Sequence, residues 1–359
     1  WYIDQMKRKA YDSEPIPSSL SHEKYRYGTR DYIIKEVTTL DTVDIKKMIK
    51  FVTEDDKKYK YKSLLQKQGY ETTYLREQDL NANYLPTESI SIPVDKKSVI
   101  KNNIVDSSLE DQIVDEIVIK IKGQALYKNR LLMLDIIAEN NWERPIYFTG
   151  GSFGDEDYLW MKDYLQLEGL CYKLVPIKTP IDQSNPYEMG RVNTEKMYPM
   201  VKSWDWGTKG SMDIYFDVES RKNSITYRSN VSRLINQLIL ENQLDKAEEI
   251  TDIIMKNMPV SIFGYYTLLE PYIESYYKVG SNEKARNLFL EISNKYQENL
   301  FYFSNLKDEN KNKYAEEIYT DIERYRSLVG VIISHEDGDF LEKEMEEFNS
   351  YLELFIGKE

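Results

Sequence analysis

The chain has 359 residues, which is enough for two domains or three small ones. Its 48 basic and 61 acidic residues give a formal net charge of -13, so a polyanion such as nucleic acid is excluded as an expected partner. One cysteine and two histidines exclude an internal disulfide, a cysteine-based zinc site and a histidine-rich centre, and we expect no metal and no cofactor. No stretch approaches the roughly eighteen apolar residues of a membrane-spanning helix, so we expect no membrane insertion by this segment.

The first residues, Trp1-Tyr2-Ile3, follow neither an initiator Met nor a signal-peptide pattern. They resemble the apolar end of an element that begins earlier, so we interpret the chain as part of a longer protein. A free terminus with an aromatic anchor is the alternative.

The N-terminal region contains three segments with readable patterns. Two prolines and clustered serines predict a loop over residues 13–19. Apolar residues from Asp44 to Val52 recur at the spacing of one helix face. Residues 88–94 are predicted to form a short strand.

Strands and helices alternate in the middle of the chain. The pattern predicts strands over 116–121, 144–149 and 170–177 and helices over 129–140 and 155–167. Strand, helix and strand within about 30 residues predict a βαβ unit with a parallel strand pair. We therefore assign residues 1–177 to an α/β domain whose sheet is partly parallel, possibly without its first elements. Cys171 lies in the last strand and is predicted to be a buried, inert thiol.

Residues 178–212 form a proline-rich connector. Three prolines, the last of them Pro199, are expected to interrupt any regular element. Trp204 and Trp206 are expected to hold part of the connector against a domain surface. We predict that the domain junction lies within this segment.

Residues 213–359 have a repeating helical pattern. Residues 244–250 recur as 282–288, and Ala285 follows Ala247 after 38 residues, slightly more than the roughly 34 of a tetratricopeptide repeat. Residues 261–264 can accommodate the extra length as a longer turn. A third helical pair is predicted over about 311–334 and 339–356. The sequence therefore predicts an all-α domain of tetratricopeptide-like hairpins.

A glycine-rich turn, Gly150-Gly151-Ser152-Phe153-Gly154, separates a predicted strand from a helix, where backbone N–H groups can bind phosphate. It matches neither a P-loop nor a dinucleotide-binding fingerprint. Asp155 and two further acids follow and would repel an anion, so we favour a tight turn with acidic helix capping.

No catalytic residue can be identified from motif or spacing. His335 and the acids up to Asp339 resemble a ligand-rich segment, but they fall where a helical hairpin requires a turn. Neither histidine lies near a nucleophile motif. The 30 tyrosines suit a binding surface, although a general bias toward Lys, Tyr, Asn and Ile is the interpretation that we favour.

Several strings agree with one known family. They are Trp1-Tyr2-Ile3-Asp4-Gln5-Met6, residues 28–34, 90–95 and 167–176, Asn141-Trp142-Glu143-Arg144-Pro145 with residues 146–148, and Gly190-Arg191-Val192-Asn193-Thr194. In this order they resemble the C-terminal soluble region of a family of bacterial multi-pass membrane proteins of unknown function. That family is similar to the protein O-mannosyltransferases of the GT-C glycosyltransferase superfamily.

The resemblance implies a function and a location. The chain would be the periplasmic part of a membrane protein of the inner membrane, with the membrane-embedded remainder of its own chain as a partner. The family resemblance implies tetratricopeptide-like repeats at the C-terminal end. GT-C enzymes carry their catalytic acid between membrane helices absent from this sequence, so no catalytic residue is transferred to any position here.

We expect the chain to bind an acceptor or partner protein rather than to transfer sugar, and whether it is an enzyme stays open. A non-enzymatic interaction module of helical repeats is the first alternative. A stand-alone enzyme acting on sugar phosphate at the glycine turn is the second. The candidate binding residues are Gly150, Gly151, Asp155, Arg191, Trp206 and Tyr276.

Overall fold

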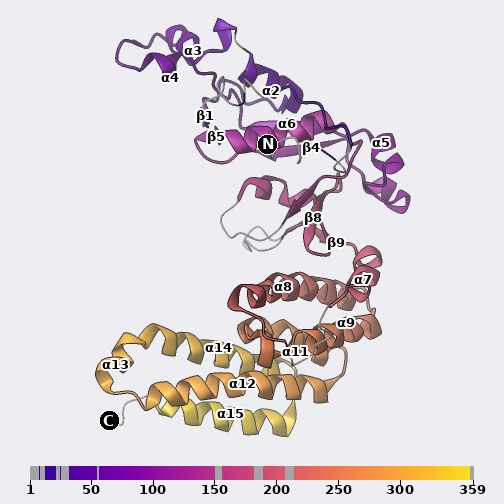
Figure 1. Ribbon diagram of the computed structural model, residues 1–359, viewed down its shortest axis with the longest axis vertical. Helices are drawn as coiled ribbons and strands as arrows, with labels where there is room; N and C mark the ends of the chain where they lie inside the picture. The colour runs from indigo at the N-terminus through magenta and orange to yellow at the C-terminus, as the bar shows by residue number, and fades with distance from the viewer. Residues whose placement is uncertain are drawn as a thin grey trace. The chain divides into compact units, whose positions relative to one another are not determined.

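The computed structural model describes residues 8, 13–21, 25, 32–54, 56–149, 156–181, 189–206 and 214–355. The chain divides into two compact units: Trp1–Gln166 with Cys171–Arg191, and Leu167–Leu170 with Val192–Glu359. The first unit mixes short strands with helices, whereas the second consists mainly of helices (Figure 1). The mixed N-terminal region and the helical C-terminal region predicted from the sequence are both present.

The strands up to residue 192 are short and form three small sheets, ordered β1-β5, β2-β3-β4 and β6-β8-β7-β9. Their bounds are β1 (Tyr32–Ile34), β2 (Val43–Asp44), β3 (Ser89–Pro93), β4 (Glu116–Lys120), β5 (Ala125–Tyr127), β6 (Tyr147–Thr149), β7 (Leu165–Glu168), β8 (Cys171–Leu174) and β9 (Arg191–Val192).

The helices of this region are α2 (Ile45–Thr53), α3 (Tyr61–Lys67), α4 (Glu77–Leu80), α5 (Lys96–Lys101) and α6 (Lys128–Asn140), with 3₁₀ turns η2 (Lys57–Tyr59), η3 (Ser107–Gln112) and η4 (Glu156–Tyr164). The predictions over 44–52, 88–94, 116–121 and 129–140 are confirmed as α2, β3, β4 and α6.

The central sheet contains the only parallel pair among the strand pairings described. In this sheet β2 runs parallel to β3, with Val43 opposite Ile90, and β4 pairs antiparallel on the other side of β3. Alternate residues of β4 are buried, so Ile117 and Ile119 face the core while Lys120 faces solvent. Helix α2 follows β2 directly and packs against β3 and α6.

The predicted βαβ unit is wrong. Strands β4 and β6, on either side of α6, belong to different sheets, and β6 pairs antiparallel with β8. The residues after η4 are extended as β7 instead of continuing a helix to residue 167. Gly169 then turns the chain at a φ of 63°, where a side chain would also meet Met200 at 2.9 Å. This turn places β8 beside β7, and β8 runs antiparallel to β6 instead of parallel.

The second unit consists of helical hairpins that follow one another along the chain. Its helices are α7 (Thr194–Lys202), α8 (Val218–Leu240), α9 (Leu244–Asn257), α10 (Val260–Phe263), α11 (Glu270–Lys278), α12 (Asn282–Ser304), α13 (Asp308–Lys313), α14 (Ala315–Ser334) and α15 (Gly338–Glu353), with the 3₁₀ turn η5 (Tyr266–Leu268). The pairs α8–α9, α11–α12 and α14–α15 are in contact, and α11 and α12 also contact the neighbouring pairs.

The two repeated alanines are core residues of their helices. Ala247 and Ala285 are completely buried near the starts of α9 and α12, where the helices of a hairpin approach each other closely. The longer turn between the first two hairpins is formed by α10 and by Gly264 and Tyr265, both at positive φ. Buried Arg228 holds this turn, because its Nη2 and Nη1 donate to the carbonyls of Met258 and Gly264 at 2.7 and 2.5 Å.

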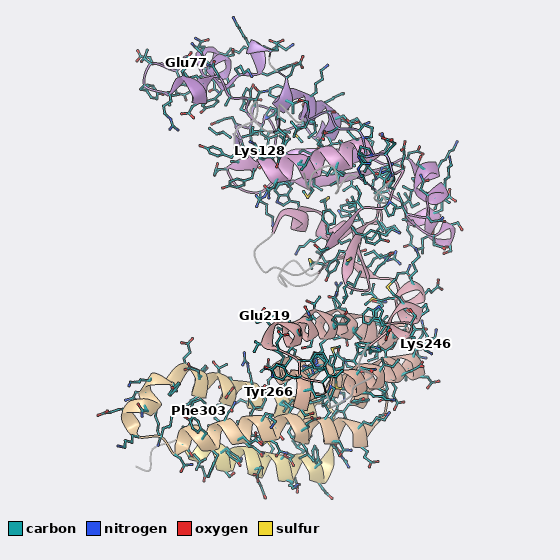
Figure 2. The ribbon with its side chains drawn as sticks, viewed as in Figure 1. Glu77, Lys128, Glu219, Lys246, Tyr266 and Phe303 are labelled. Atoms are coloured by element: carbon teal, nitrogen blue, oxygen red, sulfur yellow. The ribbon has the colours of Figure 1, made fainter. Side chains whose placement is uncertain are left out.

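Aromatic rings connect the second and third hairpins. Tyr266, Tyr296, Tyr325 and Phe348 form a continuous series with centroid distances of 5.1, 6.1 and 5.0 Å. Figure 2 shows Tyr266 among the side chains of the helical unit. Much of the tyrosine content of this region therefore serves packing.

The predicted connector is more regular than its prolines suggest. Pro199 lies inside α7 and does not interrupt it, because packing of α7 against α8 and α9 offsets the lost backbone hydrogen bond. The tryptophans are held as predicted: Trp204 and Trp206 both contact Tyr227 of α8, with centroids 5.2 and 5.9 Å away.

Among the described residues, no helix is both long enough and apolar enough to cross a membrane.

Candidate functional site

A cleft lies in the first unit at the carboxyl ends of the parallel strands β2 and β3. Asp44 ends β2 and caps α2, with its Oδ1 accepting from Lys46 N at 3.0 Å. Asp95 follows β3 and caps α5 in the same way, accepting from Lys97 N at 3.0 Å. Ligands of α/β proteins often bind outside the carboxyl ends of parallel strands. The cleft has a volume of about 520 Å³.

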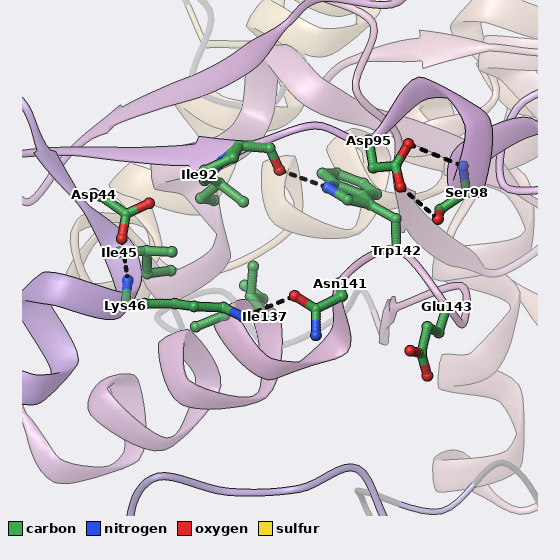
Figure 3. A pocket seen from close by; sticks show the side chains of 12 residues that line it. Asp44, Ile45, Lys46, Ile92, Asp95, Ser98, Ile137, Asn141, Trp142 and Glu143 are labelled. Carbon is green, nitrogen blue, oxygen red and sulfur yellow. Dashed lines mark hydrogen bonds between the residues drawn. The ribbon is translucent and has the colours of Figure 1, made fainter.

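The β2–β3 cleft has an apolar floor and a polar rim (Figure 3). Ile92, Ile137 and Ala138 are at most 5% exposed and form the floor with Ile45 and Trp142. The rim carries Asp44, Lys46, Asp95, Ser98, Asn141 and Glu143. Small-molecule sites typically combine such a floor with a few convergent polar groups.

The turn after α6 shapes one wall of the cleft. Asn141 and Trp142 both have left-handed backbone conformations, with φ of 47° and 60°. The Trp142 indole N–H donates to the Pro93 carbonyl at 2.7 Å, and Asn102 Nδ2 donates to the Trp142 carbonyl at 3.0 Å. Left-handed non-glycine residues require such support, and they cluster at functional sites.

The rim contains both signs of charge. Lys46 Nζ donates to Asn141 Oδ1 at 2.8 Å and so connects α2 to the turn after α6. Hydrogen bonds from Ser98 hold the pKa of Asp95 below its usual value. Among the described residues, none donates a hydrogen bond to the exposed carboxylate of Glu143. Glu143 is therefore available to a ligand.

A second candidate site is a groove of about 500 Å³ between α9 and α12. Its walls combine apolar residues with charged ones: Met255, Pro259, Val260 and Leu288, and Asp252, Lys256, Lys284 and Glu291. Tyr276 lines the groove, and its hydroxyl donates to Asp252 Oδ1 at 2.8 Å. Burial raises the pKa of Tyr276, so the hydroxyl stays protonated at neutral pH.

Some charged residues of the α9–α12 groove form ion pairs within the chain. Lys284 Nζ lies 2.6 Å from Asp252 Oδ2 and 3.0 Å from Glu248 Oε1, and the bond to Asp252 raises the pKa of Lys284. In contrast, Lys256 and Glu291 form no hydrogen bond or ion pair with any described residue. Lys256 is therefore a free cation above an apolar surface, and Glu291 is a carboxylate without a hydrogen-bond partner whose charge also acts on the buried Arg228.

The candidate residues taken from the sequence do not form one site. Gly150, Gly151 and Asp155 lie outside the described residues. Arg191 is half-buried on β9, in the first unit. Trp206 belongs to the aromatic cluster with Trp204 and Tyr227, whereas Tyr276 belongs to the α9–α12 groove.

Sequence reasoning missed the β2–β3 cleft. The signals were residues 90–95 and the string that begins at Asn141, and both were used for family resemblance and not for chemistry. The residues of the rim come from three separate parts of the chain, and no spacing rule connects them.

The turn between α14 and α15 is explained by packing. Asp337 accepts a bidentate pair from Arg286 and a 2.7 Å bond from the Tyr277 hydroxyl, while His335 stacks on the Tyr277 ring at 4.8 Å. No group of three or more potential metal ligands occurs among the residues that the structure describes.

The prediction for Cys171 is wrong in one respect, because the thiol is half-buried at the start of β8 rather than fully buried.

Residues 1–196 match the family described as TMEM260-associated domain 2. No curated protein and no solved structure gives a significant match to the chain. The family match covers the first unit with the β2–β3 cleft, and it accounts for more than half of the 359 residues. This protein therefore belongs to the TMEM260-associated domain 2 family.

Proposed function

We propose that the chain is the extracytoplasmic binding part of a membrane-embedded, GT-C-like glycosyltransferase for protein O-glycosylation. It would lie at the periplasmic face of the inner membrane, in contact with the membrane-embedded remainder of its own chain. Its helical hairpins, which we regard as tetratricopeptide-like, would bind an acceptor or partner protein. Family membership supports the link to such proteins, and the α9–α12 groove supports the binding role.

The α9–α12 groove is the observation that carries the binding role. Met255, Pro259 and Leu288 offer apolar contact area, and Lys256 and Glu291 are charges on its walls that form no hydrogen bond or ion pair with any described residue. A peptide supplies both apolar side chains and charges in a fixed order, so it can satisfy this arrangement. Apolar contact gives affinity, while the two charges determine which peptides fit.

A charge reversal tests the binding role. Twelve-residue peptides would be selected from a random library displayed on phage and titrated against the whole chain by fluorescence anisotropy. Lys256→Glu should weaken the selected peptides by at least about fivefold, since it removes one charged contact and adds repulsion. Lys222→Glu on α8 is a control outside the groove and should leave affinity unchanged. Peptides that bind both variants equally would show that the groove is not the site.

We also propose that this chain alone does not transfer sugar. Transfer from a lipid-phosphate donor needs a cavity for the lipid, a carboxylate that activates the acceptor hydroxyl and groups that stabilise the departing phosphate. Incubation with lipid-linked sugar and an acceptor peptide should give no turnover above background. Turnover that a substitution within residues 144–160 abolishes would favour the stand-alone enzyme instead.

The non-enzymatic interaction module is the second candidate, and the same groove supports it. The two candidates differ in the rest of the gene. Ten or more apolar runs of about twenty residues upstream of Trp1 would favour the membrane-embedded transferase. A complete reading frame without such runs would favour the interaction module.

A further inference from the structure

We propose that the β2–β3 cleft binds a neutral, polyhydroxylated ligand of the size of one or two sugar rings. The cleft belongs to the first unit and shares no residue with the α9–α12 groove. The inference is therefore independent of peptide binding by the helical hairpins.

The size and position of the cleft suit a small ligand. Its volume of about 520 Å³ lies within the usual range of small-molecule sites. It opens where two adjacent parallel strands end and where α2 begins, so side chains from separate elements converge on one point. The elements that carry these side chains pack against the Ile-rich core of the unit.

The floor and the rim match the two chemical surfaces of a sugar ring. Pro93 provides an exposed apolar surface for the C–H groups of a ring, next to the buried Ile92 and Ile137. The rim provides acceptors, such as the carboxylate of Glu143, and a donor in the ammonium of Lys46. Because every sugar hydroxyl both donates and accepts, a rim with both functions satisfies it better than a rim with one.

The charges of the rim favour a neutral ligand over an ion. Asp44 and Asp95 are engaged as helix caps, so Glu143 and Lys46 remain as one negative and one positive charge. An anion would meet the carboxylate of Glu143, and a cation would meet the ammonium of Lys46, which its 2.8 Å bond to Asn141 holds at the rim. A ligand without charge avoids both penalties.

Hydrogen bonds within the chain hold the wall of the cleft. The Trp142 indole is fixed to the Pro93 carbonyl, and the Trp142 carbonyl is fixed to Asn102. These bonds hold the left-handed residues of the wall in place without help from a ligand. A fixed wall lowers the entropy cost of binding, which a weak sugar ligand requires.

Ligand-observed saturation-transfer NMR on the whole chain tests the proposal. The probes are the methyl glycosides of mannose, glucose and galactose, with methylguanidinium and inorganic phosphate as the charged comparisons. We expect at least one glycoside to saturate the protein with a millimolar Kd. Glu143→Gln and Lys46→Met should each weaken it by about fivefold or more.

Two matched controls separate binding from folding. Lys50→Met on the same helix as Lys46, and Glu110→Gln on η3, change exposed charges outside the cleft and should leave the Kd unchanged. Circular dichroism would show that all four variants are folded. Lys46→Met also distinguishes the ligand classes, because it should weaken a glycoside but strengthen methylguanidinium.

Three results would overturn the proposal. The first is that no glycoside saturates the protein at concentrations where methylguanidinium or phosphate does, or that no probe binds at all. The second is glycoside binding that neither Glu143→Gln nor Lys46→Met weakens, since the sugar would then bind elsewhere. The third is equal weakening by the control substitutions. None of these results bears on peptide binding by the α9–α12 groove, so the two proposals fail separately.

Discussion

The two units of this chain fill their interiors with different chemistry. In the first unit, twelve of the 27 residues of the buried hydrophobic cluster are isoleucine. Among the described residues of the second unit, five buried tyrosines and the buried Arg228 lie between the aliphatic residues. β-Branched residues suit the short strands of the first unit, whereas rings span the distance between helical hairpins.

The difference has an energetic consequence. An aliphatic core depends on volume, so it is damaged by cavities. A tyrosine core also depends on polar partners: the Tyr272 hydroxyl donates to the Arg228 carbonyl at 2.7 Å, and the Tyr277 hydroxyl donates to Asp337. Burial raises the pKa of both tyrosines, which keeps them as neutral donors. Substitutions that remove a polar group but keep the side-chain volume should therefore destabilise the second unit more than the first.

The largest effect is expected from Arg228→Met. Burial lowers the pKa of Arg228 to about 10, so the side chain is still charged at neutral pH, and it binds backbone carbonyls rather than a carboxylate. Methionine conserves much of the volume but leaves those carbonyls without donors, which should cost about 3–4 kcal/mol of unfolding free energy. Urea unfolding followed by circular dichroism measures the loss. The exposed Lys222→Met should change stability by at most about 0.5 kcal/mol.

Leu131→Ala makes the matching test in the first unit. Leu131 is completely buried in α6, so its truncation leaves a cavity and should cost about 3 kcal/mol. The conservative Leu131→Met should cost less than about 1.5 kcal/mol, because volume is kept. Equal losses from both substitutions would contradict a core that depends on volume.

Tyr272→Phe isolates one hydroxyl. The ring stays in place, but the Arg228 carbonyl loses its donor, which should cost about 1–1.5 kcal/mol. Tyr319→Phe is the control, because that ring is 65% exposed and should have no measurable effect. If Tyr272→Phe leaves the free energy of unfolding unchanged, the buried hydroxyl does not stabilise the second unit. The two units would then differ only in the shapes of their core side chains.

The smallest effects concern two carboxyl groups of the helical unit with opposite pH dependence. Burial raises the pKa of Glu344, so its contribution to stability is present at low pH and is lost as pH rises through the folded pKa. Glu344→Gln should therefore raise the melting temperature by a few degrees at pH 7 and have little effect below about pH 4.

Asp337 should behave in the opposite way. Its bond to Arg286 lowers the pKa of Asp337, so its contribution is present above the unfolded pKa of about 3.9 and is lost as pH falls through the folded pKa. Asp337→Asn should lower the melting temperature at pH 7 and lose this effect in strong acid. Melting curves of the two variants across pH that move in the same direction would contradict both assignments.

The spacing of residues within one segment was sufficient to predict a helix or strand whose buried face is formed by that segment. The apolar spacing after Asp44, the alternation in 116–120 and the repeated alanines at 247 and 285 each predicted the observed element, since a buried face imposes its period on the sequence. Pairing between strands was not predictable in the same way. One left-handed glycine, Gly169, reversed β8 and replaced the expected parallel pair with an antiparallel one.

The sequence by itself determined the class of each region, the positions of α2, α6, α14 and α15 and the family resemblance, because these depend on composition, period and contiguous strings. Only the tertiary structure decided which polar residues meet. Lys46 and Asn141 are 95 positions apart but share a hydrogen bond, and Arg286 reaches Asp337 across 51 positions. Such contacts depend on how whole elements pack, and packing is set by many weak interactions that no short segment of sequence contains.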